Sequence, residues 1–448
     1  MHYYSTLHQS PVQSFSEAML AGQAPDGGLY MPARFEPLDH AAQHESYAAL
    51  AARVLTPFVR DAFSERELFA ICEQAYDFEP FEEVLDERLV VLRLDTGPTA
   101  SFKDFGARFL ALATAALLRR RGGKLLVLTA TSGDTGSAVA SAFHRLEQVR
   151  VLVLFPAKEI SERQRKQMTS LGDNVLAVSV NGTFDQCQAL VKRAFREPRL
   201  AQYCLSSANS INIGRLLPQM VYYVASAQHA LTRSGAAKCD FVVPCGNLGN
   251  LVAGLFAAQS GLPVRRFIAA TNANDELVPY LREGRYQPIA PSRACLSNAM
   301  NVGHPSNLAR LVALFGGTMD AAGRLLSQAD LQALRACLSV KSVTDEQTLA
   351  SIRDAWRERS LLLEPHGAVA YACRELDASP QVPRIVLETA HPAKFPEAIR
   401  MAFGDETGPQ LALPPSLKGI DEAEEHFLSI EADDEALLAL AQSHARAQ

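Results

Sequence analysis

The stretch KLLVLTATSGDTGSAVASAF (124–143) determines the fold class. It begins with an unbroken apolar run, continues through a loop of Ser, Gly, Asp and Thr, and ends in a segment of small and apolar residues at helical spacing. A continuous apolar strand that leads directly into a helix is typical of a parallel sheet covered on both faces. The stretch therefore predicts a strand over 124–130 and a helix after it.

The same alternation continues along the chain. Further apolar, strand-like runs stand at 149–156, 174–180, 240–244, 265–272 and 384–390. Helical patterns follow several of them, near 161–170, over 184–195 and after 250. Strands that alternate with helices indicate α/β architecture.

Two regions depart from this alternation. Residues 1–90 are mainly helical and polar, with a turn-rich stretch at 23–32, and are interpreted as an added N-terminal region. Residues 273–345 are irregular and rich in Asn, Ser and Arg, which predicts an insertion covering the sheet. The alternating core therefore has an extension before it and an insertion within it.

Composition excludes several classes of function. The 448 residues carry a net charge of −6, so no nucleic-acid or membrane partner held by charge is expected. The N-terminus lacks a signal-peptide pattern, and no apolar run reaches the about 20 residues that span a bilayer. Eight cysteines occur without a C-x-x-C pair, and no metal-binding pattern appears. We expect a cytoplasmic protein without a metal site.

One lysine stands in an unusual place. In SFKDFGARF (101–109), Lys103 lies between Phe102 and Asp104 at the start of a mostly apolar helical stretch. Lysines are rarely buried without a reason. A buried lysine with a lowered pKa can serve as an imine-forming amine.

The loop GNLGN (246–250) follows an apolar strand and begins a helix. Glycines let main-chain N–H groups approach an anion, and a helix N-terminus adds partial positive charge. A phosphate site is one interpretation, and a tight turn without a ligand is the other. The loop is not a Walker A motif, since no G-K-[ST] follows.

Three further places carry polar side chains. In TATSGDTGSA (129–138), Ser132, Asp134 and Thr135 could hold a carboxylate or simply cap a helix. In the stretch 206–219, a set of donors could bind a phosphate ester or form a capping network with a surface arginine: Asn209, Ser210, Asn212 and Arg215. Thr389 ends an apolar strand, where ligands bind in open α/β sheets, although strand-end threonines are common.

Taken together in order, these motifs resemble the threonine synthase family, in its longer branch with an extended N-terminal region. The resemblance rests on GPTASFKDFGARF, TATSGDTGSA, SANSINIGRLLPQ, GNLGN, TNANDELVPYL, EPHGAVAY and TAHPAKF, and runs from about residue 15 to 400. It implies the pyridoxal 5′-phosphate fold type II: two open, mostly parallel sheets flanked by helices, plus a helical N-terminal region. The implied domains are 1–95, a smaller α/β domain at 96–235 with the cofactor lysine, and a larger cofactor-binding domain at 236–448.

The resemblance also implies roles for individual residues. Lys103 is the lysine that carries the cofactor and moves protons, and Thr389 faces the ring nitrogen, where a neutral hydroxyl tempers the electron sink. The cofactor phosphate falls to Gly246, Asn247, Leu248, Gly249 and Asn250. The substrate carboxylate falls to Ser132, Asp134 and Thr135, and the substrate phosphate to Asn209, Ser210 and Arg215. No catalytic role is expected for His366 or His391.

The implied reaction turns O-phospho-L-homoserine and water into L-threonine and phosphate, in a monomer or small homo-oligomer. A phospho-lyase releasing 2-oxobutanoate and a non-catalytic descendant of the fold are the alternatives, and the intact Lys103 disfavours the second. A nucleotide-binding protein using GNLGN is a third, disfavoured by the missing P-loop lysine. The chain departs from the family at Thr96-Gly97-Pro98-Thr99, where H-G-P-T is the family pattern.

Overall fold

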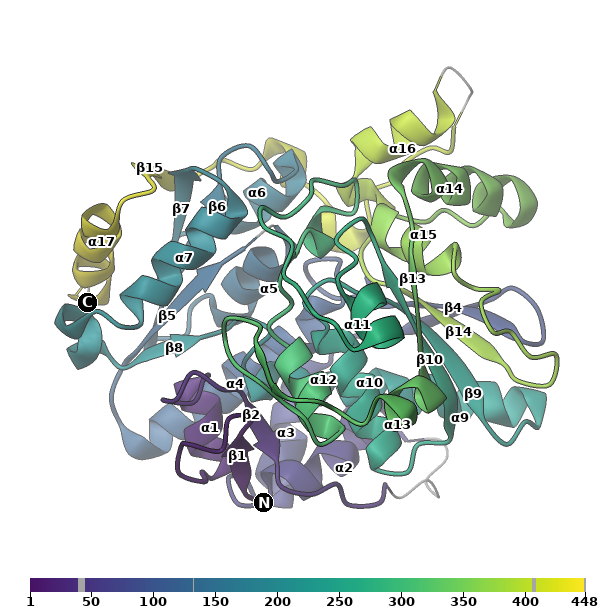
Figure 1. Cartoon of the computed structure of the whole chain (residues 1–448). Helices are drawn as coiled ribbons and strands as arrows, with labels where there is room; N and C mark the ends of the chain where they lie inside the picture. The colour runs from purple at the N-terminus through teal and green to yellow at the C-terminus, as the bar shows by residue number, and fades with distance from the viewer. Residues whose placement is uncertain (39–44, 132, 405–407, 447–448) are drawn as a thin grey trace.

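Two open sheets organise the molecule, one on each side of a central junction, with the N-terminal helices packed below them (Figure 1). The computed structural model describes residues 1–38, 45–131, 133–404 and 408–446. The two open, mostly parallel sheets flanked by helices confirm the predicted fold class.

The smaller sheet has five strands, all parallel, in the order β15-β7-β6-β5-β8. The strands are β5 (Leu125–Ala130), β6 (Val149–Pro156), β7 (Val175–Asn181), β8 (Leu205–Ser207) and β15 (Phe427–Glu431). Its helices are α4 (Lys103–Arg121), α5 (Asp134–Phe143), α6 (Glu162–Thr169), α7 (Phe184–Ala194) and α17 (Asp434–Arg446). The chain thus returns to this sheet near its C-terminus.

The larger sheet has six strands in the order β13-β10-β9-β14-β4-β3, and β3 alone pairs antiparallel. The strands are β3 (Phe81–Val84), β4 (Leu89–Arg93), β9 (Cys239–Pro244), β10 (Val264–Thr271), β13 (Leu338–Ser342) and β14 (Arg384–Glu388). Its helices include α9 (Met220–Ser234), α10 (Gly249–Gln259), α14 (Asp345–Arg359), α15 (Pro365–Tyr371) and α16 (Pro396–Phe403).

The remaining elements cover the base and front of the molecule. The N-terminal region contributes β1 (Tyr3–Ser5), β2 (Tyr30–Pro32), α1 (Phe15–Ala21), α2 (Tyr47–Val59) and α3 (Glu65–Ala75). The irregular stretch near 273–345 contributes α11 (Leu277–Glu283), α12 (Leu308–Leu314), α13 (Leu331–Cys337), β11 (Thr318–Met319) and β12 (Leu325–Ser327). Short α8 (Ile213–Leu216) joins the two sheets.

Helix α4 carries the lysine that the sequence singled out, and aromatic packing fixes its first turn. The ring centroid of Phe105 lies 4.8 Å from that of Phe78 and 5.5 Å from that of Tyr222. The helix ends in three arginines followed by Gly122 at φ 74, where positive charge and a left-handed glycine both favour termination. Its start is therefore anchored in the core while its end faces solvent.

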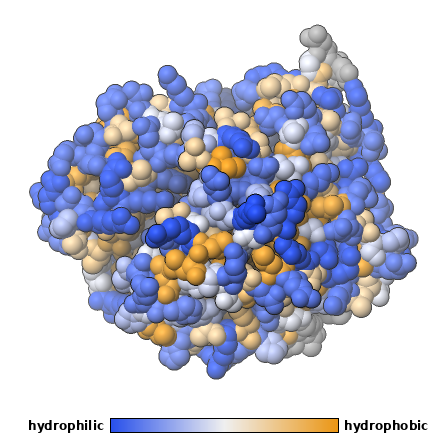
Figure 2. Space-filling view, viewed as in Figure 1, coloured by the Kyte–Doolittle hydropathy of each residue, from blue (hydrophilic) through white to orange (hydrophobic). Residues whose placement is uncertain are grey.

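Figure 2 shows a mainly hydrophilic face on which hydrophobic side chains form small groups. Among the described residues, no helix is long and apolar enough to cross a bilayer.

Candidate active site

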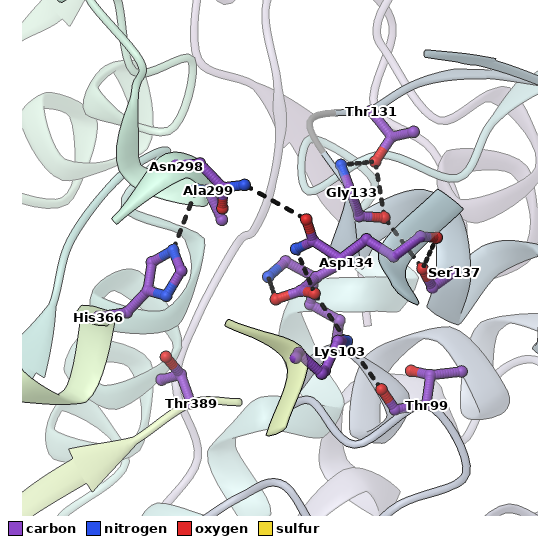
Figure 3. Close-up of polar contacts among 12 residues, drawn as sticks. Thr99, Lys103, Thr131, Gly133, Asp134, Ser137, Asn298, Ala299, His366 and Thr389 are labelled. Atoms are coloured by element: carbon purple, nitrogen blue, oxygen red, sulfur yellow. Dashed lines mark hydrogen bonds and ion pairs between the residues drawn. The ribbon is translucent and has the colours of Figure 1, made fainter. Parts of the chain in front are cut away.

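Lys103 is the first residue of α4 and lies largely buried at the junction of the two sheets, with a side chain 12% exposed. Its Nζ stands 3.4 Å from Oδ2 of Asp134 (Figure 3). The same atom lies 4.5 Å from the ring centroid of Phe102. Burial lowers the pKa of Lys103, and the nearby charge of Lys394 adds to this, while Asp134 opposes it. The site therefore favours the neutral, nucleophilic amine more than water does.

Asp134 starts α5 and is engaged with two lysines. Its Oδ1 lies 2.7 Å from Nζ of Lys394 and accepts a hydrogen bond from Gln164 at 2.9 Å. Lys394 is fully buried and also donates to the main-chain oxygen of Thr99 at 2.9 Å. Burial alone would raise the pKa of Asp134, but Lys394 and Lys103 outweigh it and hold that pKa well below its ordinary value. The carboxylate is therefore ionised and surrounded by cations.

The GNLGN loop joins β9 to α10 in a strained left-handed turn, with Leu248 at φ 60. Asn247 donates to Oγ of Ser210 at 2.6 Å, which joins this loop to the one after β8. Oδ1 of Asn250 accepts from two tyrosine hydroxyls, whereas its buried Nδ2 has no partner. A Cβ on Gly246 would lie 2.9 Å from the main-chain oxygen of Ala299, so only glycine fits there. The loop is therefore held in place by hydrogen bonds, and it contains one side-chain donor without a partner, Nδ2 of Asn250.

Arg215 is buried, 2% exposed, so the alternative of a surface arginine is wrong. Its Nη1 donates to the main-chain oxygen of Ala208 at 2.8 Å, and its buried Nε has no partner. Nearby, Oδ1 of Asn209 accepts from the hydroxyl of Thr129. These groups come from the loop and helix after β8, and they leave a cationic donor unused.

Arg310, on α12, is a second fully buried guanidinium, which the sequence analysis missed. Its donors reach Tyr30 O at 3.1 Å, Asn307 Oδ1 at 2.6 Å and Ile211 O at 2.6 Å. Asn307 in turn donates to the main-chain oxygens of Asn247 and Ser210. Arg310 therefore supports both loops from behind. It stands in an ordinary apolar helix, so no local pattern could have identified it.

Neither of these arginines has an anionic partner. Within the described residues, no carboxylate forms an ion pair with Arg215 or Arg310. Burial lowers the pKa of Arg215 to about 10 and that of Arg310 to about 9, so both stay charged at neutral pH. All three guanidinium nitrogens of Arg310 donate to protein oxygens, whereas Nε of Arg215 has no partner, so the unused cationic donor beside the two loops belongs to Arg215.

Thr389 follows β14 and faces the same junction, beside a buried acidic group. Its hydroxyl donates to Oε1 of Glu364 at 3.2 Å. Glu364 and Lys394 lie in the EPHG and HPAKF segments, but their contacts with Thr389 and Asp134 connect distant parts of the chain. The sequence therefore gave no signal for their roles.

Ser132 lies outside the described residues. Thr135 is half-buried in the first turn of α5. Thr96, where the family pattern has histidine, is exposed and donates to the main-chain oxygen of Glu79 at 2.7 Å. In the described part of the chain, no group of three or more His, Cys, Asp or Glu side chains could hold a metal ion.

Family models match almost the whole chain. A model described as "Pyridoxal-phosphate dependent enzyme" covers residues 75–386. Models described as "Threonine synthase N terminus" and "Threonine synthase, C-terminal" cover 2–76 and 367–440. The order of these matches agrees with the order of the motifs along the sequence.

Individual proteins agree with the family models. A threonine synthase of Haemophilus influenzae is 39% identical over 93% of this chain and 94% of its own length. That of Escherichia coli is 37% identical over 90% and 92%.

Solved structures are similar over the full length. The pyridoxal-phosphate-bound threonine synthase of Brucella melitensis has a TM-score of 0.90 and 34% identity over 100% of both chains. The yeast enzyme has a TM-score of 0.89 and 29% identity over 99% of this chain and 98% of its own. The chain belongs to the threonine synthase family of pyridoxal-phosphate-dependent enzymes.

Proposed function

We propose that the chain converts O-phospho-L-homoserine and water into L-threonine and inorganic phosphate. The observation that carries this proposal is the buried guanidinium of Arg215, whose Nε has no partner, beside a lysine with a lowered pKa. A reaction that binds a phosphorylated cofactor and a phosphorylated substrate needs positive charge for two phosphates next to one reactive amine. This arrangement suits such a reaction.

Pyridoxal 5′-phosphate stabilises negative charge that develops on the carbon atoms of an attached amino acid. Lys103 would carry this cofactor, and Thr389 would face its ring nitrogen. The cofactor phosphate would be held by Gly246, Asn247, Leu248, Gly249 and Asn250. The unpartnered Nδ2 of Asn250 and the position of the loop at the N-terminus of α10 support this assignment.

The substrate would be held by its two anionic ends. Its carboxylate would meet the N-terminus of α5 at Asp134 and Thr135, and the sequence motif adds Ser132 to this group. Because the carboxylate of Asp134 already contacts Lys103 and Lys394, its main-chain N–H and not its side chain would serve there. The substrate phosphate would meet Asn209, Ser210 and Arg215, where the unpartnered Nε of Arg215 is the strongest support.

Lys103 would move the protons of the reaction. Its freed amine would take a proton first from Cα and then from Cβ of the substrate, and the Cγ–O bond would break as phosphate leaves toward Arg215. A water molecule would then bond to Cβ through its oxygen, and protons would return to Cγ and Cα. The lowered pKa of Lys103 favours the amine that begins this sequence, and Asp134 would stabilise the ammonium that forms.

The assignment is tested by the visible spectrum of the holoenzyme together with its products. O-phospho-L-homoserine is added, and phosphate, threonine and 2-oxobutanoate are measured together. The expected result is a cofactor band and equal amounts of threonine and phosphate, both lost in Lys103→Ala and kept in Lys238→Ala, an exposed control. Phosphate matched by 2-oxobutanoate would show a phospho-lyase instead. A cofactor band without turnover would contradict the proposed substrate.

Three broader assignments accompany this function. We propose that the enzyme is cytoplasmic. We also propose that it is a monomer or small homo-oligomer, and sedimentation of the purified holoenzyme tests this oligomeric state. The division into 1–95, 96–235 and 236–448, with an insertion near 273–345, stays a prediction. Limited proteolysis that cuts near 95 and 235 would support it.

A further inference from the structure

A buried acidic cluster lies behind Thr389, and the proposed function does not use it. It joins the start of α15 to the end of β14, and its members are at most 3% exposed: Glu364, His366 and Glu388. Buried acidic groups are retained only where hydrogen bonds or charges balance them. The hydrogen bonds of these three side chains therefore indicate whether each one is protonated, and at which atom.

Glu364 acts only as an acceptor. Its Oε2 accepts from the main-chain N–H of His366 at 2.7 Å and also contacts Nδ1 of the same residue. Its Oε1 accepts from the main-chain N–H of Gly367 at 2.9 Å and from the hydroxyl of Thr389 at 3.2 Å. Four donors on two oxygens leave no place for a proton, so Glu364 is an ionised carboxylate.

The imidazole of His366 is fixed in one tautomer. Its Nε2 accepts a hydrogen bond from the main-chain N–H of Ala299 at 3.0 Å (Figure 3). Nε2 is therefore unprotonated, and the ring proton sits on Nδ1, where it points at Glu364. The ring is neutral and does not cancel the charge of Glu364.

Glu388 adds no second negative charge. Its Oε1 accepts from the main-chain N–H of Glu364 at 2.8 Å, while its Oε2 is buried without a partner. Burial and the charge of Glu364 raise the pKa of Glu388 well above its ordinary value, which favours the neutral carboxyl. One negative charge, on Glu364, therefore lies directly behind Thr389.

The hydroxyl of Thr389 has one proton, which it donates in a hydrogen bond to Glu364. Toward the junction of the sheets, the same oxygen can only accept a hydrogen bond. We propose that Glu364 acts through Thr389 as the counter-ion of a protonated ring nitrogen in the bound cofactor. This inference rests on the proposed position of Thr389 opposite that nitrogen. Glu364 is then a positioning residue, since it acts through another side chain.

The inference changes the expected electronics of the site. The sequence analysis expects a neutral hydroxyl that tempers the electron sink. A hydroxyl polarised by a carboxylate does the opposite, because it stabilises the pyridinium form and strengthens the sink. A strong sink suits a reaction that forms negative charge first at Cα and then at Cβ. The ring proton comes from solvent when the cofactor binds and is retained, so no net proton transfer is added to the reaction.

The test is the NMR resonance of the ring nitrogen in holoenzyme reconstituted with isotopically labelled cofactor. The expected resonance is that of a protonated pyridinium at neutral pH. Thr389→Ser, which keeps the hydroxyl, should keep that position. Thr389→Val and Glu364→Gln should move it to that of unprotonated pyridine. Thr389→Val inserts no new polar group into the cluster, so the comparison stands even if Glu364→Gln fails to fold.

The outcomes separate this inference from the function on which it rests. An unprotonated ring nitrogen in the wild-type holoenzyme would overturn the role of Glu364 while leaving the cofactor site intact. A resonance unchanged in Thr389→Val would overturn it as well. Absence of any cofactor band in the wild type would instead contradict the proposed cofactor site.

Discussion

The six-stranded sheet and the junction beside it differ in how they accommodate buried arginines. At the amino ends of its strands, Asp240 is fully buried and pairs with Arg384 at 2.8 Å and also with Arg265. In the loops and short helices at the junction of the two sheets, Arg215 and Arg310 are just as buried and form no ion pair within the described chain. The protein neutralises one set of charges itself and leaves the other for ligands.

This difference gives a way to tell structural from functional charges. A complete ion pair stabilises the folded chain only while both partners are present, and removing one leaves a buried charge. An unpaired guanidinium weakens the folded chain until an anion binds it. Substitution of Asp240, which pairs with buried Arg384, should therefore affect stability, and substitution of Arg215, which has no ion pair, should affect binding.

The largest expected effect is at Asp240, in the buried ion pair. Asp240→Asn leaves Arg384 buried without its ion pair, so the free energy of unfolding should fall by about 3–5 kcal/mol. Denaturant titration of the holoenzyme measures this, with the exposed Asp185→Asn as a matched control. The kcat of folded Asp240→Asn should stay within about twofold of wild type. A stable but inactive Asp240→Asn would break the comparison.

A smaller effect is expected at Arg215, the buried arginine without an ion pair. Arg215→Met removes a charged hydrogen-bond donor from the proposed phosphate site, worth about 1.5–3 kcal/mol. For O-phospho-L-homoserine, kcat/KM should fall roughly 10- to 100-fold, since about 1.4 kcal/mol is tenfold. The free energy of unfolding of the ligand-free protein should not fall, because an unpaired buried charge is lost. Loss of stability with unchanged kcat/KM would show that Arg215 is structural.

The smallest effect concerns a third way of handling charge. Glu276 is 4% exposed with an unpartnered Oε2, and burial raises its pKa to about 7. Because the folded state holds this proton more tightly than the unfolded chain, stability falls as pH rises from about 4.5 to 7. Glu276→Gln should raise the free energy of unfolding by about 1–2 kcal/mol at about pH 8.

The same substitution provides its own control. At about pH 4.5, where the folded wild type keeps the carboxyl protonated, Glu276→Gln should give no gain. Denaturant titrations at both pH values measure the difference. A gain of equal size at both would mean that protonation of Glu276 does not carry the effect.

Local patterns predicted the parts of the fold that are locally determined. The strand expected at 149–156 is found at Val149–Pro156, because an uninterrupted apolar run has no other stable place than a covered sheet. β4 was missed inside a region interpreted as helical, and β8 has only three residues. β15 pairs with β7 across about 250 residues of chain, which no local pattern reports.

The site divides in the same way. The GNLGN loop, the start of α5 and Lys103 carry local strand–loop–helix signals and were predicted. Lys394, Glu364 and Arg310 were not, because their importance lies in contacts with residues far away in the sequence. A lysine in HPAKF looks like any other lysine until Asp134 is seen to face it.

The unpartnered donor of Arg215 is the central feature of the proposed phosphate site, and calorimetric titration of the holoenzyme with inorganic phosphate tests most directly whether phosphate binds there. Arg335, a control, donates only to main-chain oxygens on the surface. The account predicts binding that weakens by about tenfold or more in Arg215→Met and is unchanged in Arg335→Met. Equal affinity in wild type and Arg215→Met would contradict it.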